Sequence, residues 1–396
     1  MSWPGWELTN PPTRSPEVAA VKEALFNQLT WAREWPGFQA SHDTTPDAYD
    51  AATRDVIAEY QRRTGMVAAG TAVAGICNTA TEFRLGVTRP PAPERHACLT
   101  FRGTGGVIGQ DYTSLVAQAC SQRVEEIPVP TPAAMGPVPV GTASDPHAPS
   151  GEQCVDAMLE WAVQWVEDHA GRTLLIGGYS LGAIAATRLR MEFLPGGRLE
   201  KFAHNYIAGY TFGNPARAFG HTFYLGAIPN GEGIADIHLP AAACTWDWCD
   251  EADQLDIYTN VPPNQTGQIM RDVYKDVMAL QINDPVALAQ AMIPRLLDTV
   301  KDAGVNLPFP DLGGIVSGVL AGLVLGLLGN ALPGVASDSR AAAAVQAAIL
   351  GIRFAADNPP TRPHITYQDE AAMPGQSHLA HAIQHVNDWA SRVPVR

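Results

Sequence analysis

The sequence predicts an α/β protein with a parallel central sheet, a helical insertion and a small all-α domain at its N-terminal end. Two observations predict the sheet: from residue 97 onward short apolar runs alternate with helical segments, and glycine-rich turns follow several of the runs. A third observation predicts the separate domain, because helical periodicity over 17–86 is followed by three prolines within 90–93.

The composition excludes several classes of protein. Hydrophobic residues make up 46% of the 396 residues, which is incompatible with a disordered chain. The 26 basic residues are outnumbered by 40 acidic ones, and the net charge of −14 argues against nucleic-acid binding. None of the six cysteines has CxxC spacing, so the sequence predicts neither a disulfide scaffold nor a structural zinc site.

Residues 1–88 are predicted to form the helical domain, and 89–96 a stiff linker. Helical periodicity appears in 18–29, in 51–63 and in 79–85. The sequence Tyr-Gln-Arg-Arg-Thr-Gly at 60–65, with Ala-Gly at 69–70, resembles the common three-helix peptidoglycan-binding domain. That resemblance implies a peptidoglycan-binding site within 17–86; the alternative is a helical cap packed on the next domain.

Residues 97–265 and 351–396 are assigned to the α/β domain. Its predicted strands are 97–101, 173–177 and 206–212, and its predicted helices are 150–168, 181–193 and 377–391. The segment 128–149 contains seven prolines and is predicted to be a surface loop.

The sequence Gly-Tyr-Ser-Leu-Gly at 178–182 lies between a predicted strand and a predicted helix. This is the nucleophile elbow of α/β-hydrolases, in which both glycines permit a tight turn and the serine hydroxyl stands above the sheet. Ser180 is therefore the predicted nucleophile. The predicted oxyanion hole combines the amide of Leu181 with that of Thr104, in the glycine-rich loop after strand 97–101.

The chain order of this fold places the acid after Ser180 and the histidine last. Asp256 is the predicted acid, because the apolar pair that follows it can anchor its loop, and Asp253 is the alternative. His364 is the predicted base, because it precedes the final helix. The histidines inside that helix are expected to be partly exposed; they are His378, His381 and His385.

Five stretches of the α/β part resemble the lysin B family of mycobacteriophages, a cutinase-like group of serine esterases. They are Leu-Thr-Phe-Arg-Gly-Thr-Gly at 99–105, Gly-Tyr-Ser-Leu-Gly-Ala-Ile at 178–184, Gly-Asn-Pro-Ala-Arg at 213–217, Asp-Ile-Tyr at 256–258 and Pro-His-Ile-Thr-Tyr at 363–367. The resemblance covers 97–396 and implies a cutinase-like α/β-hydrolase fold. Arg102 stands where the family often has His, and Leu181 where it often has Gln, which bears on substrate preference.

The resemblance implies a phage endolysin that hydrolyses the ester bond between mycolic acids and arabinogalactan during lysis, with no metal or organic cofactor. We expect synthesis in the host cytoplasm and action in the cell envelope after membrane disruption, because the first residues lack the charged and apolar regions of a signal peptide. Two other functions stay open: a general cutinase or lipase on soluble or lipid esters, and a non-catalytic wall-binding virion protein.

The segment 266–350 is predicted to be a helical insertion, which lysin B relatives also carry as a linker domain. Its part 312–337 has no charged residue, and glycine recurs there at every fourth position: Gly314, Gly318, Gly322 and Gly326. We predict that these glycines let two helices pack closely beside an acyl channel. The alternatives are contact with a lipid or membrane surface through 312–329 and a transmembrane span.

Cys244 and Cys249 are separated by four residues just before the predicted acid loop. A disulfide between them would close a short loop and hold this segment. Two buried thiols are the alternative, and the sequence leaves both open.

Overall fold

The computed structural model describes residues 5–87, 95–130, 149–222, 228–278, 285–305, 318–331, 336 and 339–396. The chain divides into two compact units, Met1–Glu94 and Arg95–Arg396. The division falls inside the proline-rich segment 89–96.

The described residues of the N-terminal unit form α1 (Pro16–Gln28), α2 (Thr30–Arg33), α3 (Phe38–Thr44), α4 (Ala51–Arg63) and α5 (Thr79–Arg84). The side chains of Ser15, Asp50 and Asn78 accept hydrogen bonds from backbone N–H groups in the first turns of α1, α4 and α5, which explains where these helices begin. Their apolar faces enclose one core that includes Val18 and Ile57. The sequence predicts α1, α4 and α5 but not α2 and α3.

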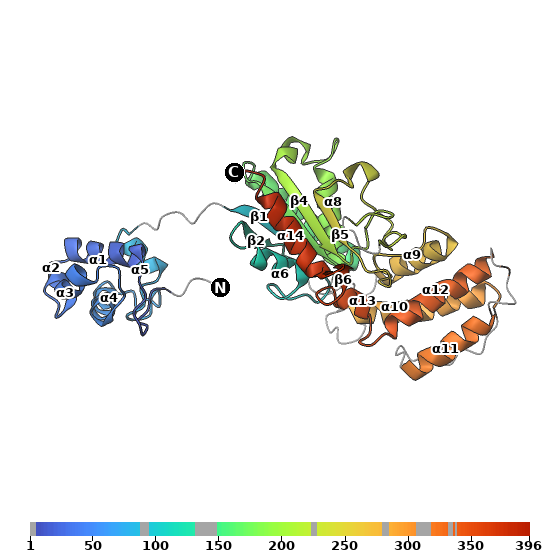
Figure 1. Cartoon of the computed structure of the whole chain (residues 1–396), viewed down its shortest axis with the longest axis horizontal. Helices are drawn as coiled ribbons and strands as arrows, with labels where there is room; N and C mark the ends of the chain where they lie inside the picture. Colours follow the sequence, from blue (N-terminus) through green and yellow to red (C-terminus); the bar gives the residue numbers. More distant parts are fainter. Residues whose placement is uncertain are drawn as a thin grey trace. The chain divides into compact units, whose positions relative to one another are not determined.

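A five-stranded parallel sheet forms the centre of the second unit (Figure 1). Its strands lie in the order β2 (Val124–Pro128), β1 (His96–Phe101), β3 (Leu174–Tyr179), β4 (Tyr206–Phe212) and β5 (Trp248–Glu251). Strands β1, β3 and β4 are buried on both faces, and this explains their continuous apolar sequences. The sheet confirms the predicted α/β fold class.

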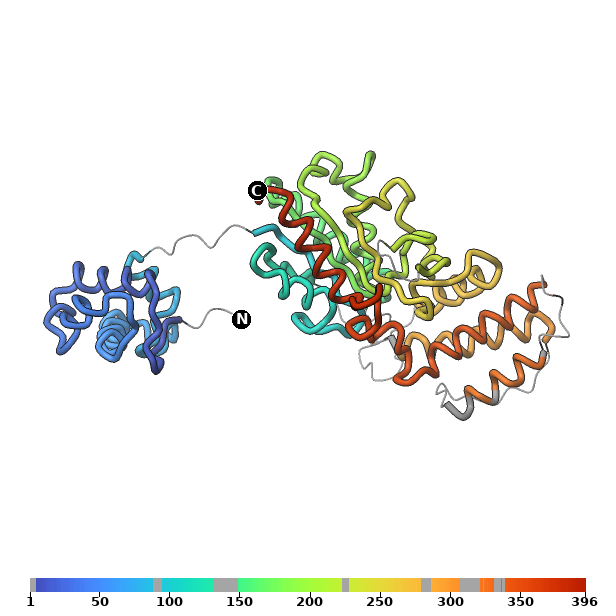
Figure 2. The backbone as a smooth tube through the Cα atoms, viewed as in Figure 1, coloured from blue at the N-terminus to red at the C-terminus, as the bar shows by residue number. Residues whose placement is uncertain are grey.

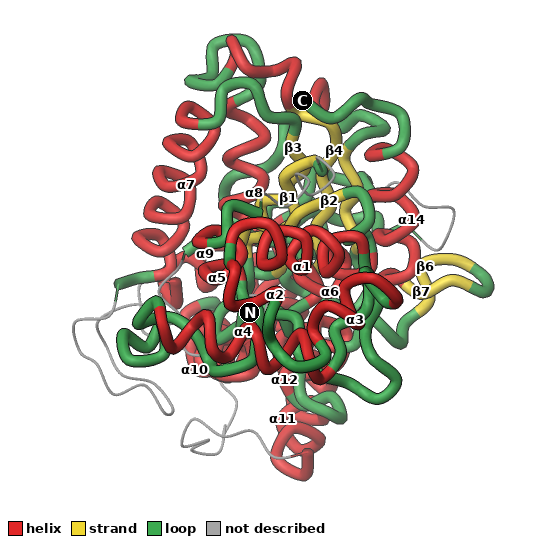
Figure 3. Tube along the Cα trace, turned by 90° about the vertical axis from the view of Figure 1, so that its left-hand side faces the viewer, coloured by secondary structure: helices red, strands yellow, loops and turns green. Residues whose placement is uncertain are grey.

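Helices cover both faces of this sheet, with α7 (Gly151–Asp168) on one side and α14 (His378–Ala390) on the other (Figure 3). The helix α8 (Leu181–Glu192) packs with α7, and α6 (Tyr112–Ala119) packs with α14. Ser150 begins α7 with a capping box, and Ser377 caps α14, as the sequence predicts for both boundaries. The sheet is therefore buried in two layers of apolar side chains.

Of the described helices that follow β5, four lie together at one end of the second unit (Figure 2). They are α9 (Gln265–Met278), α10 (Pro285–Asp302), α11 (Gly318–Ala331) and α12 (Arg340–Ala355). Helix α12 packs against the other three. These helices occupy the segment predicted to be a helical insertion, 266–350, except that α9 begins one residue before it and α12 continues five residues beyond its end.

The predicted close packing through the glycine stripe is wrong in the part that the structure describes. Gly322 and Gly326 are exposed, and a Cβ added at either would meet no described atom within 4 Å. Helix α11 instead turns Ala321, Val324 and Leu328 toward the core. Gly314 lies outside the described residues, and Gly318 is the first residue of α11.

Close approach between insertion helices occurs elsewhere, at Gly351 of α12. A Cβ there would lie 2.5 Å from Cδ1 of Leu296, which belongs to α10. Among the described helices, none has the length and apolar character needed to cross a membrane.

Candidate active site

The nucleophile elbow places Ser180 between β3 and α8. Ser180 has φ 53° and ψ −124°, a backbone conformation that an L-residue rarely adopts. Both glycines of the motif are sterically required: a Cβ on Gly178 would lie 2.7 Å from Cα of Ala183, and one on Gly182 would lie 2.3 Å from the carbonyl oxygen of Phe101. The tight strand-to-helix turn therefore follows directly from the motif.

Three predicted residues meet in one hydrogen-bonded chain. His364 Nε2 lies 2.9 Å from Ser180 Oγ, and His364 Nδ1 lies 2.7 Å from Asp256 Oδ2. The side chains of His364 and Asp256 are fully buried. Since Nδ1 faces a carboxylate, it carries the imidazole proton, and Nε2 is left to accept the hydroxyl proton of Ser180.

Asp256 is held by two further donors. The backbone N–H of Tyr258 donates to Oδ1 over 3.0 Å, and the hydroxyl of Tyr367 donates to Oδ2 over 2.7 Å. Burial raises the pKa of Tyr367 well above its usual value, and the charge of Asp256 raises it further, so this hydroxyl stays protonated. The sequence alone gives Tyr367 no separate role, although this residue lies three positions after His364 in the stretch Pro-His-Ile-Thr-Tyr at 363–367.

His364 lies in the single helical turn α13 (Arg362–Ile365), in the segment before the final helix. Short strands β6 (Ala371–Met373) and β7 (Gln376–Ser377) separate this turn from α14. The imidazole is flanked by the rings of Tyr179 and Tyr258, at centroid distances of 5.2 and 4.7 Å. Tyr179 also donates to the carbonyl of His364 over 3.1 Å. These contacts fix the ring in the orientation that joins its two partners.

The other acidic residues near β5 have different partners. Asp253 accepts from the backbone N–H of Leu255, and its hydrogen bonds include none to His364. Asp250 is paired with His221, and Asp247 lies near Arg190. The geometry therefore favours Asp256 over the alternative Asp253.

The Gly-Asn-Pro-Ala-Arg stretch at 213–217 packs against His364 and hydrogen-bonds to neighbouring loops. Gly213 has φ 54°, and a Cβ there would lie 2.5 Å from Cε1 of His364. Asn214 bonds the buried Asp250, and the fully buried Arg217 donates to backbone carbonyls that include those of Thr259 and Gly231. The stretch thus folds the loops around His364 and supplies no reacting group.

The loop after β1 approaches the nucleophile. A Cβ on Gly103 would lie 3.0 Å from Cβ of Ser180, and Thr104 is the next residue. Leu181 is the first residue of α8, where backbone N–H groups have no partner within the helix. The two predicted oxyanion donors thus come from segments next to Ser180, and their role stays a prediction.

The histidines of α14 are more buried than expected. His378 and His385 are only 2% and 6% exposed, and His381 is partly buried. His378 and His381 each place Nδ1 against the buried carboxylate of Glu251. The expectation of partly exposed side chains is therefore wrong for His378 and His385. All three lack a hydrogen bond to Ser180 in the structure as described.

The cysteines are free thiols in the structure. Cys244 donates to the carbonyl of Pro240, and Cys249 lies beside Glu251 on β5. The structure therefore has two thiols and no bridge, with Cys249 buried as in the second alternative and Cys244 only partly buried.

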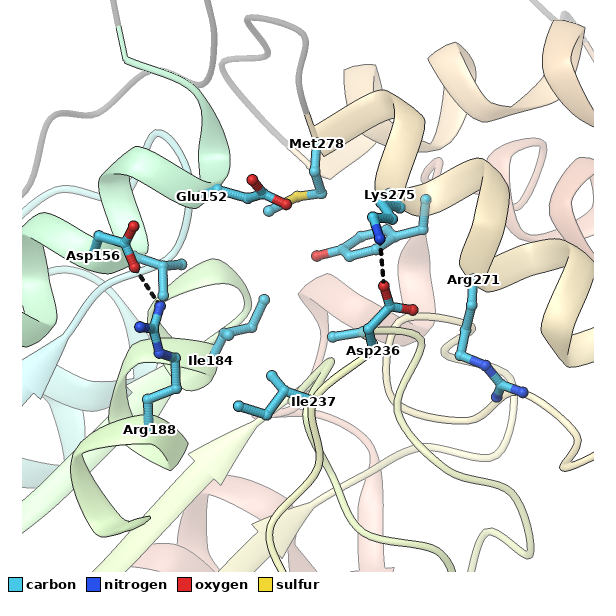
Figure 4. A pocket seen from close by; sticks show the side chains of 12 residues that line it. Glu152, Asp156, Ile184, Arg188, Asp236, Ile237, Arg271, Lys275 and Met278 are labelled. Carbon is cyan, nitrogen blue, oxygen red and sulfur yellow. Dashed lines mark hydrogen bonds and ion pairs between the residues drawn. The ribbon is translucent and has the colours of Figure 1, made fainter. Parts of the chain in front are cut away.

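A pocket of about 390 Å³ opens between α7, α8, α9 and the segment 235–237 (Figure 4). Ile184 lines it from α8, one helical turn after Ser180, which is about 6 Å along the helix axis. Apolar side chains, among them Val155, Ile237 and Met278, share the lining with ion pairs such as Asp156–Arg188 and Lys275–Asp236.

A scan against protein-family models matches none, and a search of the curated proteins also gives no match. Similar solved structures include lysin B from mycobacteriophage D29, with 14% identity, a TM-score of 0.38, and coverage of 74% of this chain and 99% of that chain. The catalytic core of acetyl xylan esterase from Trichoderma reesei has 17% identity, a TM-score of 0.33, and coverage of 48% and 97%. A cutinase-like protein from Cryptococcus sp. has 17% identity, a TM-score of 0.32, and coverage of 42% and 79%.

The class of the protein follows from its own fold and site. A parallel sheet, a nucleophile elbow and a buried serine–histidine–aspartate chain define an α/β-hydrolase. The site is that of a serine hydrolase.

Proposed function

We propose that the chain is a lysin B-type serine esterase that cleaves mycolic acids from arabinogalactan. The observation that carries the catalytic part is the chain of two hydrogen bonds from Ser180 through His364 to Asp256. The substrate part is supported by the sequence stretches that resemble lysin B and by the pocket beside α8.

In the proposed reaction His364 Nε2 takes the proton of Ser180 as Oγ attacks the ester carbonyl. The amides of Leu181 and Thr104 stabilise the oxyanion, at the positive end of α8. His364 then gives its proton to the sugar oxygen, which leaves, and water hydrolyses the acyl-enzyme by the reverse proton transfers. Asp256 holds the imidazole in the correct tautomer and balances its charge.

The pocket beside α8 is the proposed site for the first part of the acyl chain. One of its apolar residues, Ile184, lies one turn from the nucleophile, and the ion pairs Asp156–Arg188 and Lys275–Asp236 supply polar groups in the same lining. Ile184→Trp should therefore reduce hydrolysis of a long-chain ester about tenfold or more, because a misfit between an acyl chain and an apolar substrate pocket costs ~1–3 kcal/mol of transition-state binding. A butyrate ester should be spared, and an equal loss on both esters would contradict the assignment.

The function is tested by incubating the enzyme with purified mycolyl-arabinogalactan and measuring released mycolic acid by mass spectrometry. Ser180→Ala is the blank, and an emulsified triglyceride is the competing substrate. Release of mycolic acid at a higher kcat/KM than of triglyceride fatty acid supports the proposal. Turnover of the triglyceride alone favours a general lipase, and failure of a fluorophosphonate probe to label Ser180 favours the non-catalytic wall-binding protein.

The N-terminal unit is the proposed peptidoglycan anchor, and the proposed site of action is the host cell envelope. Deleting residues 1–88 should leave hydrolysis of a soluble p-nitrophenyl ester unchanged, because the catalytic groups all lie in the second unit. The truncated protein should sediment less with purified peptidoglycan. Equal sedimentation of both proteins would contradict the anchor.

A further inference from the structure

A second cluster of chemically reactive side chains lies between the edge strand β5 and α14. Cys249 and Glu251 are two positions apart on β5, so both side chains point to the same face of the sheet. His378 and His381 are three positions apart on α14, so they share one side of that helix. Helix α14 packs on β5, and the two pairs therefore meet.

The donor atoms of this cluster are close enough to bind one ion. Sγ of Cys249, a carboxylate oxygen of Glu251 and a ring nitrogen of His381 all lie within 4.8 Å of one another. The distance from Sγ to His381 Nδ1 is 3.7 Å, and that from Sγ to Glu251 Oε1 is 3.3 Å. Zinc bound by sulfur at ~2.3 Å and by nitrogen or oxygen at ~2.1 Å has ligand-to-ligand distances of roughly 3.4–3.6 Å.

One distance must change for an ion to enter. His381 Nδ1 lies 2.6 Å from Glu251 Oε1, which is a hydrogen bond, and this pair must separate by roughly 0.8 Å to reach the tetrahedral spacing. The side chain of His381 is 12% exposed, whereas Glu251 is fully buried, so the imidazole is the group that moves. Cys249 and Glu251 are already fixed by the strand.

The surroundings supply what a metal site needs outside its ligands. His378 Nδ1 donates to the second oxygen of Glu251 over 2.7 Å and orients the carboxylate, and the ring of Tyr367 packs against His378 at 5.2 Å. A cavity of about 240 Å³ is lined by His381, together with Trp246 and Gln384, so the cluster borders a cavity on its His381 side.

We propose that Cys249, Glu251 and His381 form a binding site for a divalent cation of the zinc class, with water as the fourth ligand. Sulfur, imidazole and carboxylate together are donors that suit Zn²⁺ and not Mg²⁺ or Ca²⁺. Binding releases the thiol proton of Cys249, and the proton on His381 Nδ1 moves to Nε2, so that the imidazole binds the ion through Nδ1 in its neutral form. The bound ion joins α14 to the edge strand five residues before Asp256.

The test uses the full chain, freed of metal by dialysis against a chelator. Titration with Zn²⁺ in a calorimeter should give one ion per chain, and Co²⁺ should produce the near-ultraviolet absorption band of a thiolate ligand. Cys249→Ser and His381→Ala should each weaken Zn²⁺ binding by at least ~100-fold, since even loss of an outer-shell partner costs ~10–100-fold. Cys244→Ser is the matched control, because that thiol bonds only backbone carbonyls among the described residues, and it should bind as wild type.

Several results would overturn the proposal. The wild type could take up no stoichiometric Zn²⁺, Cys249→Ser could bind as tightly as wild type, or Cys244→Ser could lose the Co²⁺ band. Circular dichroism of each metal-free variant checks its fold. Because His381 is partly exposed, His381→Ala tests metal binding without disturbing the core. Wild-type ester hydrolysis measured in parallel keeps this outcome separate from the proposed function.

Discussion

Two buried carboxylates, one on β5 and one shortly after it, each accept a hydrogen bond from histidine. The groups on the far side of these carboxylate–histidine pairs differ. Asp256 and Glu251 are both fully buried, and both accept from histidine Nδ1 atoms of the C-terminal segment. Beyond its imidazole Asp256 reaches the hydroxyl of Ser180, whereas Glu251 has two imidazoles and a thiol. A carboxylate–imidazole pair therefore does not by itself make a catalytic site; the group on the far side of the imidazole decides the chemistry.

The largest effect is expected when the serine is removed from the chain of Ser180, His364 and Asp256. Ser180→Ala should lower kcat by about 10⁶-fold, because the other groups of the site have no nucleophile to activate. The rate of p-nitrophenyl butyrate hydrolysis measures the loss, and unchanged thermal unfolding shows that the fold is intact. Residual activity above one per cent would assign the nucleophile to another residue.

Removing the charge of the first carboxylate should have the next largest effect. Asp256→Asn should lower kcat by about 10⁴-fold, because the amide no longer fixes the imidazole tautomer. The matched control is Asp253→Asn, the neighbouring acid without a bond to His364, which should stay within a fewfold of wild type. A reversed order of the two rates would transfer the role to Asp253.

Asp256 also accepts a hydrogen bond from the hydroxyl of Tyr367. Tyr367→Phe should lower kcat about tenfold, because a hydrogen bond to a charged group contributes ~1.5–3 kcal/mol and part of this is lost from the transition state. The rate of p-nitrophenyl butyrate hydrolysis measures the loss, and thermal unfolding checks that the fold is intact. A rate equal to that of the wild type would show that this hydroxyl does not act on the triad.

The smallest change in rate is expected at the second carboxylate, where stability should respond instead. Glu251→Gln should alter kcat at most fewfold, but it should lower the free energy of unfolding by about 1–3 kcal/mol, because an amide nitrogen then faces a buried imidazole donor. Denaturant unfolding of the metal-free protein measures this. Glu125→Gln, on a half-exposed ion pair, is the control and should change stability by less than ~1 kcal/mol. If both substitutions lowered the free energy of unfolding equally, Glu251 would have no special role in stability.

The parts of the molecule that the sequence predicts are those whose signal is local in the chain. Strands β1, β3 and β4 are buried on both faces, so they appear as apolar runs, and the helix boundaries at Ser150 and Ser377 appear as capping residues. Ser180 is found from the local elbow. The glycine stripe misleads, because a four-residue repeat of small residues permits close packing but equally fits an open face.

Strands β2 and β5 escape prediction for a physical reason. The edge strand β2 contains Glu125 and Glu126 and ends in proline, and β5 contains Asp250 and Glu251 in only four residues. Both β5 carboxylates are buried because their partners come from distant segments: Asn214 and His221 for Asp250, and the α14 histidines for Glu251. The cluster around Cys249 is missed for the same reason, since CxxC spacing detects only ligands close in sequence.

The backbone of Ser180 carries a consequence for how such a protein evolves. A non-glycine residue at φ 53° holds ~1–3 kcal/mol of conformational strain, which the rest of the fold must offset. Glycine adopts this conformation without strain, so the sequence most favourable for folding at this position is one that cannot react. Selection for robustness alone would therefore erase the nucleophile, and its presence in the chain marks a site at which function and stability oppose each other.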